Sequence, residues 1–111
     1  MTFQEVSSMI GEFGIDYDYY QFKKGTDQAT PFVCFFYSDN NDLLADDSNY
    51  QKIENLNIEL YTDEKDFTLE AQIEAVLSSH GMVWSRSETY LDDEKMYEVI
   101  YEMDVVITAG G

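Results

Sequence analysis

The stretch Tyr97–Ile107, YEVIYEMDVVI, decides the fold because its side chains alternate strictly between two kinds. Every second position, starting at Glu98, belongs to one set: the acids Glu98, Glu102 and Asp104, with Ile100 and Val106 interspersed. The other positions are aromatic or aliphatic throughout: Tyr97, Val99, Tyr101, Met103, Val105 and Ile107. A period of two is typical of a strand with one face on a hydrophobic core. We therefore expect the acidic face to lie toward water or a channel.

Further strands are predicted upstream of this one. Met82–Leu91 forms a hairpin with it, through a turn at Asp92-Asp93-Glu94. In Ile53–Thr62 the apolar residues again alternate, whereas Phe32–Tyr37 is almost continuously apolar and predicts a central strand buried on both faces. Ile15–Phe22 is rich in aromatic residues and alternates in part, which also favours a strand.

A first helix is predicted at the N-terminus. Thr2 followed three residues later by Glu5 is a capping-box pattern, so the helix begins at Phe3. Gly14 is the better candidate for a left-handed residue after its end. One apolar stripe at helical spacing lies on a core or on a neighbour: Phe3, Val6, Met9, Ile10 and Phe13.

A second helix follows the strand Ile53–Thr62. Asp63 and Asp66 are both candidates for its N-cap, and His80-Gly81 closes it. Its apolar stripe consists of Leu69, Ile73, Val76 and Leu77. Consecutive strands with short connections, plus two helices, predict an α+β fold with a mainly antiparallel sheet and both helices packed on it. The length of 111 residues fits a single domain, 1–111.

The charge excludes several classes of partner. The chain has 23 Asp and Glu residues against 6 Lys and Arg, a formal net charge of −17. Proteins that bind nucleic acid tightly neutralise phosphates with clustered Lys and Arg, and Lys23-Lys24 is the only basic pair here. We expect no tight nucleic-acid binding and no membrane partner. In one interpretation the acidic surface keeps the protein soluble. In another it repels DNA that moves past the protein, so that the DNA does not bind.

The sequence contains no pattern that indicates catalysis, so we expect a protein that is not an enzyme and needs no cofactor. The single histidine, His80, lies at a predicted helix C-terminus, where an imidazolium suits the helix dipole. There is no Gly-rich phosphate loop and no His or Cys cluster for a metal. Cys34 and Trp84 lie in apolar segments, and we expect both to act by packing.

A long polar and acidic stretch, Ser38–Asn49, is predicted to be a loop. It is interrupted by Leu43 and Leu44, which either pack onto the domain or contact a partner. If both leucines were fully buried against a partner, their burial would contribute roughly 3–6 kcal/mol before the costs of association. They are therefore candidates for an interface.

Several segments resemble small tail-completion proteins encoded by long-tailed phages and prophages of Gram-positive bacteria. The similar residues span most of the chain from about Ala45 to Met103, and the order of elements is similar to the tail terminator fold. The segments are Ile58–Asp66, Leu69-Glu70, Glu74–Leu77, Ala45-Asp46, Tyr50, Ser87–Tyr90 and Tyr97–Val99.

The resemblance implies a homo-hexameric ring in the virion, at the tail–head junction, assembled from protein made in the bacterial host cytoplasm. Such a ring ends the tail tube, joins it to the head connector, and lets DNA pass through its centre. Glu98, Glu102 and Asp104 are then candidates for an acidic lumen. The candidate contact residues are Leu43, Leu44, Phe3 and Phe13.

Two other functions remain open from the sequence. A head-closure or connector ring of the same neck region would share the size, the charge and the lack of chemistry. An acidic DNA mimic would present carboxylates in place of phosphates and block an enzyme that acts on nucleic acid. The mimic would be a monomer or dimer that binds a basic protein, whereas a terminator would form sixfold rings.

Overall fold

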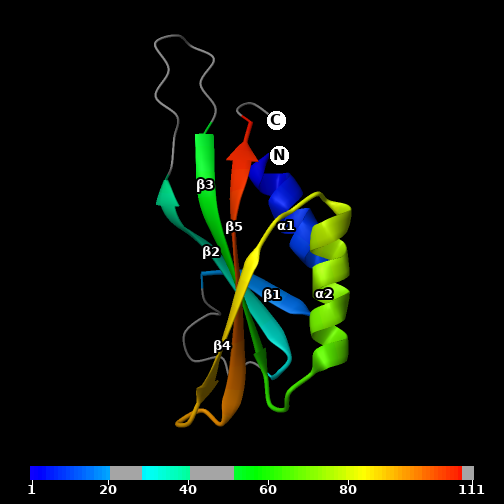
Figure 1. Cartoon of the computed structure of the whole chain (residues 1–111), viewed down its shortest axis with the longest axis vertical. Helices are drawn as coiled ribbons and strands as arrows, with labels where there is room; N and C mark the ends of the chain where they lie inside the picture. The colour runs from blue at the N-terminus through cyan, green and yellow to red at the C-terminus, as the bar shows by residue number, and fades with distance from the viewer. Residues whose placement is uncertain (21–28, 41–51, 109–111) are drawn as a thin grey trace.

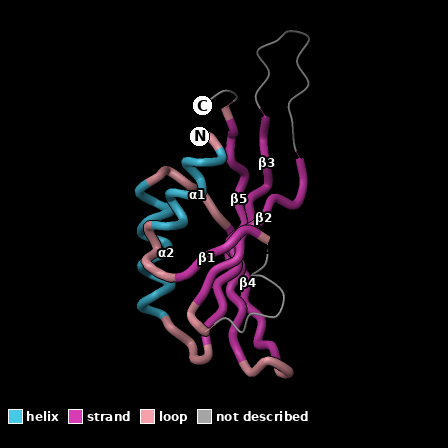
Figure 2. The backbone as a smooth tube through the Cα atoms, turned by 180° about the vertical axis from the view of Figure 1, so that it is seen from behind, coloured by secondary structure: helices cyan, strands magenta, loops and turns pink. Residues whose placement is uncertain are grey.

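Both helices pack on the same face of one sheet, as Figure 1 and the reverse view in Figure 2 show. The computed structural model describes residues 1–20, 29–40 and 52–108. Within them the sheet has the strand order β1-β2-β3-β5-β4. The elements are α1 (Phe3–Gly11), β1 (Asp16–Tyr19), β2 (Phe32–Asn40), β3 (Lys52–Thr62), α2 (Phe67–Ser79), β4 (Ser85–Leu91) and β5 (Met96–Ile107). The α+β class and the two helices are confirmed.

The sheet is mainly antiparallel, as predicted. β3 lies at its centre and pairs antiparallel with β2 on one side and with β5 on the other. β4 and β5 form the predicted hairpin. β1 differs, because it pairs in parallel with β2. A parallel pair requires a connection that returns the chain to the same end of the sheet, so β1 and β2 are not joined by a hairpin turn.

The first helix begins where the capping box predicts. The Thr2 hydroxyl accepts a hydrogen bond of 3.1 Å from the Glu5 amide, and Glu5 Oε1 accepts one of 2.9 Å from the Thr2 amide. These bonds lower the pKa of Glu5, since they favour its charged form. The helix ends at Gly11, and Gly14 takes the expected left-handed conformation with φ +81°.

The N-cap of the second helix is Asp66, the second of the two candidates. Its Oδ1 accepts a hydrogen bond of 2.9 Å from the Leu69 amide, which satisfies one of the free donors of the first turn. His80 is the C-cap and Gly81 follows with φ +75°. The His80 ring lies 2.8 Å from Glu12 Oε2, a contact that ties the end of α2 to the end of α1.

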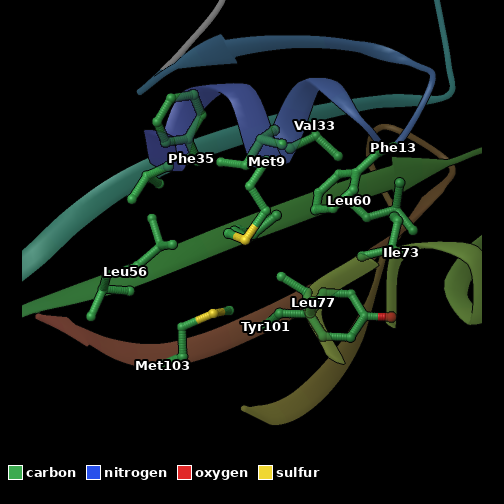
Figure 3. Close-up of a cluster of buried hydrophobic side chains, with 14 of the residues drawn as sticks. Met9, Phe13, Val33, Phe35, Leu56, Leu60, Ile73, Leu77, Tyr101 and Met103 are labelled. Carbon is green, nitrogen blue, oxygen red and sulfur yellow. The ribbon is translucent and has the colours of Figure 1, made fainter. Parts of the chain in front are cut away.

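The core lies between the sheet and the helices (Figure 3). Met9 of α1, Phe13 beyond the end of α1, and Ile73 and Leu77 of α2 meet the inner side chains of the strands there. The alternation of β5 is confirmed, because every second side chain is buried on this face: Val99, Tyr101, Met103, Val105 and Ile107. Cys34 is also buried, and Trp84 packs against the core as expected.

Three strand boundaries differ from the prediction. β2 continues through Asn40, so the expected loop does not begin at Ser38. The Ser38 side chain is held in the strand by hydrogen bonds to Asn55 and Asn57 of β3, which a polarity pattern does not reveal. β1 stops at Tyr19, because Tyr20 has φ 69°. β4 begins only at Ser85, while Met82 packs against the core ahead of it.

Candidate functional site

The face of the sheet opposite the helices is acidic, and we call it the acidic face. Its carboxylates are Asp16, Asp18, Glu59, Glu98, Glu102 and Asp104, assigned from the strand registers. On β5 the sequence placed Glu98, Glu102 and Asp104 on the side away from the core, and this placement is confirmed. Glu102 and Asp104 are exposed, while Glu98 is half-buried.

Basic side chains lie elsewhere in the described part of the chain. Lys52 and Arg86 stand opposite Ile107 and Tyr101, so they project on the helix side of the sheet. Lys65 precedes α2, and Lys95 lies in the turn between β4 and β5. The described strands therefore place no Lys or Arg among the carboxylates of the acidic face. Its negative charge is not neutralised from within the same face.

A tyrosine bridges two of these carboxylates. The Tyr61 hydroxyl lies 2.7 Å from Glu98 Oε2 and 3.3 Å from Glu59 Oε1. Partial burial and the neighbouring charge of Glu98 raise the pKa of Glu59. Burial and the hydrogen bond to Glu98 raise the pKa of Tyr61, so the tyrosine keeps its proton as a donor. The two carboxylates are thus held together despite their repulsion.

Amide side chains fix a third carboxylate of the face. Asn55 Nδ2 donates to Asp104 Oδ1 at 3.2 Å, and Asn57 Nδ2 donates to Asn55 Oδ1 at 3.0 Å. The Ser38 hydroxyl donates to the same Asn55 oxygen at 2.6 Å. This row crosses β2, β3 and β5. It orients the carboxylate of Asp104 without supplying a positive charge.

The predicted contact residues divide into three groups. Phe3 is 47% exposed and is available to a partner. Phe13 was wrong as a contact residue, because it is fully buried in the chain's own core and offers no surface. The α1 stripe faces the sheet, and Phe13, beyond the end of the helix, fills the core between α1 and α2. Leu43 and Leu44 lie outside the described residues.

The structure also forms a pocket that the sequence analysis missed. Phe3, Tyr19, Phe35, Tyr37 and Glu54 line a hollow of about 440 Å³ beside the start of α1, and we call it the aromatic pocket. Phe3 meets Tyr37 edge-on with ring centres 5.2 Å apart, and Tyr19 meets Phe35 in the same way at 5.2 Å. One signal was present in the sequence: Glu54 is a carboxylate at a core-facing position of β3, in step with Leu56, Ile58 and Leu60.

A second missed feature is a charge network between α2 and β4. Glu70 is 3% exposed and its Oε2 lies 2.6 Å from Lys65 Nζ, while its Oε1 lies 3.5 Å from Arg86 Nη1. Lys65 also binds Glu88, and Arg86 binds Glu74 at 2.9 Å. Burial lowers the pKa of Lys65, but its hydrogen bonds with Glu70 and Glu88 outweigh this and raise it. The network attaches the helix to the edge strand.

The described residues include no group of three or more His, Cys, Asp and Glu side chains placed to hold a metal ion. In the described part of the chain, neither helix is long and apolar enough to span a bilayer.

The fold itself is shared with a known particle protein. A chain in the solved structure titled "Virion of native gene transfer agent (GTA) particle" matches this one with a TM-score of 0.56. The match covers 95% of this chain and 87% of that chain at 12% sequence identity, so it shows a common fold. No protein-family model matches the sequence, and a search of curated proteins gave no match.

Proposed function

We propose that this protein is a structural subunit of the head–tail junction of a long-tailed phage. Six copies form a ring that ends the tail tube and joins it to the head connector, and DNA passes through the centre. The partners are the tail tube protein, the connector and further copies of the same chain. The protein acts by assembly and not by catalysis.

The observation that carries the proposal is the fold. A chain of a virion particle has the same fold over nearly the whole length of both chains. The sequence independently resembles tail-completion proteins in the strand β3, the start of α2 and the β4–β5 hairpin. The shared fold and the sequence resemblance together favour a particle component over an acidic DNA mimic.

The acidic face supports the proposal that DNA passes through the centre of the ring. Carboxylates on an open sheet face, with no Lys or Arg among them in the described strands, repel phosphates at short range. A lumen lined in this way lets DNA move without binding the wall. In this proposal Glu98, Glu102 and Asp104 face the lumen.

The role is tested in the phage or prophage whose genome encodes the chain. Deletion of the gene should leave filled heads and free tails that electron microscopy shows to be unjoined, and a plasmid copy should restore joined particles. Intact infectious virions without the protein would overturn the proposal. Free tails of normal length that lack only the connection would favour a head-closure ring over a terminator.

The lumen assignment has its own test in the same complementation. Glu102→Lys with Asp104→Lys changes two exposed carboxylates of the acidic face and should lower the infectious titre by impeding DNA. The matched control is Asp63→Lys with Glu64→Lys, which makes the same charge change in the exposed connection between β3 and α2. Equal titres for the two variants would show that the acidic face does not face DNA.

A further inference from the structure

The aromatic pocket has the chemistry of a receptor for a positively charged side chain. Four aromatic rings surround it, and the faces of such rings attract cations. Glu54 contributes a carboxylate that is 9% exposed at residue level and accepts no hydrogen bond from the described residues. The nearest described cation, Lys52 Nζ, lies 3.8 Å from Glu54 Oε1, beyond hydrogen-bond distance.

A second polar group in the pocket has no hydrogen-bond partner among the described residues. The Tyr37 hydroxyl is buried and makes no hydrogen bond within the described part of the protein. Burial, with the nearby Tyr19 and Glu54, raises the pKa of Tyr37 to about 12, so the phenol stays neutral. Its oxygen can accept a hydrogen bond, and buried polar groups without one are uncommon in folded proteins. This hydroxyl is enclosed by the pocket wall, so the pocket offers the Glu54 carboxylate and aromatic walls to one incoming donor.

The chain itself carries a matching donor. Among the described basic residues, Lys65 and Arg86 are engaged with Glu70, and Lys52 lies beside Glu54. Lys95 has no acidic group within 4.0 Å in the described residues. It is exposed at the end of the β4–β5 turn, directly before β5, and has φ 54°, a conformation that glycine adopts with less strain. The rest of the turn is Asp92, Asp93 and Glu94, so only the lysine side chain is suited to enter a hollow beside a carboxylate.

The two features cannot meet within one molecule. Glu54 pairs with Val105 near the end of β5, whereas Lys95 directly precedes β5 at Met96. At about 3.4 Å per residue, the strand between them spans roughly 30 Å. Figure 1 shows the β4–β5 turn at the lower end of the molecule and the start of α1 toward the upper end.

We infer that the aromatic pocket receives the ammonium group of Lys95 from a second copy of the chain. Glu54 holds the ammonium group, while Phe3 and Tyr19 flank the side chain. The contact joins different surfaces of the two copies, so each copy keeps one pocket and one lysine for a further neighbour. Repetition of such a contact closes a ring when the rotation fits. The inference rests on the ring of the proposed function and names the contact that builds it.

Measurements of self-association test this contact directly. In sedimentation velocity over a range of concentrations, Lys95→Gln and Glu54→Gln should each weaken self-association at least about tenfold. Lys95→Arg should retain it, because a guanidinium also binds aromatic faces and carboxylates. Lys52→Gln makes the same charge change but removes the cation beside Glu54, so it should leave association unchanged or strengthen it. Circular dichroism melts confirm that each variant is folded.

A mixture of variants separates this contact from a general loss of stability. Lys95→Gln retains an intact pocket and Glu54→Gln retains an intact lysine, so an equimolar mixture should form dimers that do not grow further. Benzoylphenylalanine in place of Phe3 should crosslink on illumination to the 92–95 turn of another copy.

Three results would overturn the inference: association of Lys95→Gln equal to wild type, no dimers in the mixture, or a wild-type chain that stays monomeric. The junction role would still be decided separately by the particle images.

Discussion

The hydroxyl group of Tyr101 donates a hydrogen bond of 2.9 Å to Glu74 Oε2, and this joins the core of the sheet to the second helix. The same carboxylate oxygen accepts a hydrogen bond of 2.9 Å from Arg86 of β4. The Tyr101 residue is otherwise fully buried, and burial and the bond to Glu74 raise the pKa of its hydroxyl. A buried aromatic ring with a satisfied polar end therefore fixes the position of α2 on β5.

Removal of that hydroxyl should weaken the fold slightly. Tyr101→Phe keeps the ring and leaves Glu74 bonded to Arg86, so we expect a loss of about 1 kcal/mol in the free energy of unfolding. Urea denaturation measures it. Tyr97→Phe, a hydroxyl deletion on the same strand, is the control and should change stability by less than about 0.5 kcal/mol. Equal losses would show that the bond to Glu74 contributes nothing.

The buried carboxylate of the charge network should matter more than the exposed one. Glu70→Ala leaves Lys65 and Arg86 without their shared buried partner and should cost about 1–3 kcal/mol. Glu88→Ala removes the exposed partner of the same lysine and should cost less than about 1 kcal/mol. Thermal melts of both variants at one salt concentration compare them. A larger loss for Glu88→Ala would contradict the assignment of Glu70 as the anchor.

The raised pKa of Glu59 predicts that replacing this residue stabilises the protein in a pH-dependent way. Because the pKa is raised in the folded state, the folded protein binds the proton more tightly than the unfolded chain does. Stability from this group is present at pH below the ordinary glutamate pKa of 4.5 and is lost as pH rises through the higher pKa of the folded state. Glu59→Gln should thus raise the melting temperature at pH 7 and have no such effect near pH 4. The gain should stay below about 1 kcal/mol, since solvent screens this partly exposed group.

The two phenylalanines predicted as contact residues should behave differently. Phe13→Ala empties a fully buried position and should cost about 3–5 kcal/mol of folding stability. Phe3→Ala alters an exposed side chain and should cost less than about 1 kcal/mol while it opens one wall of the aromatic pocket. Chemical denaturation of both variants decides this. A stable, folded Phe13→Ala protein would contradict its place in the core.

Duplex DNA should not bind the isolated protein at physiological salt. The acidic face repels phosphates, and the chain has 6 Lys and Arg against 23 acids. Fluorescence anisotropy with a labelled duplex should show no complex at micromolar protein. A micromolar complex that weakens steeply with added salt would contradict the charge argument.

The local patterns of the sequence predicted most of the fold. The period of two in β5 fixed which side chains are buried, because alternate residues of a strand point to opposite faces. The capping box at Thr2 predicted the start of the first helix, and Gly14 takes the expected left-handed conformation beyond its end. These features depend on residues close together in the chain, so they can be inferred without a tertiary structure.

The missed features depend on residues far apart in the sequence. The aromatic pocket needs Phe3, Tyr19, Tyr37 and Glu54 from α1 and three different strands, and its existence follows from their pairing. The parallel pairing of β1 likewise cannot be inferred from the composition of β1 itself. The misassignment of Phe13 has the same origin. An apolar stripe at helical spacing shows that the residues are buried, but not whether the chain's own sheet or a partner covers them.

The formal net charge of −17 surrounds the molecule with a negative electrostatic field that is not the same on every side. The carboxylates of Glu102 and Asp104 lie on one side of the sheet with no Lys or Arg among them in the described strands, whereas on the other side Lys65 and Arg86 offset much of the charge of Glu70, Glu74 and Glu88. Two charged bodies that diffuse toward each other rotate in each other's field before they touch, and dissolved ions reduce this torque. The protein should therefore meet a strongly charged polymer or partner in a preferred orientation. The rate of productive encounters should then depend on ionic strength even where the final complex does not.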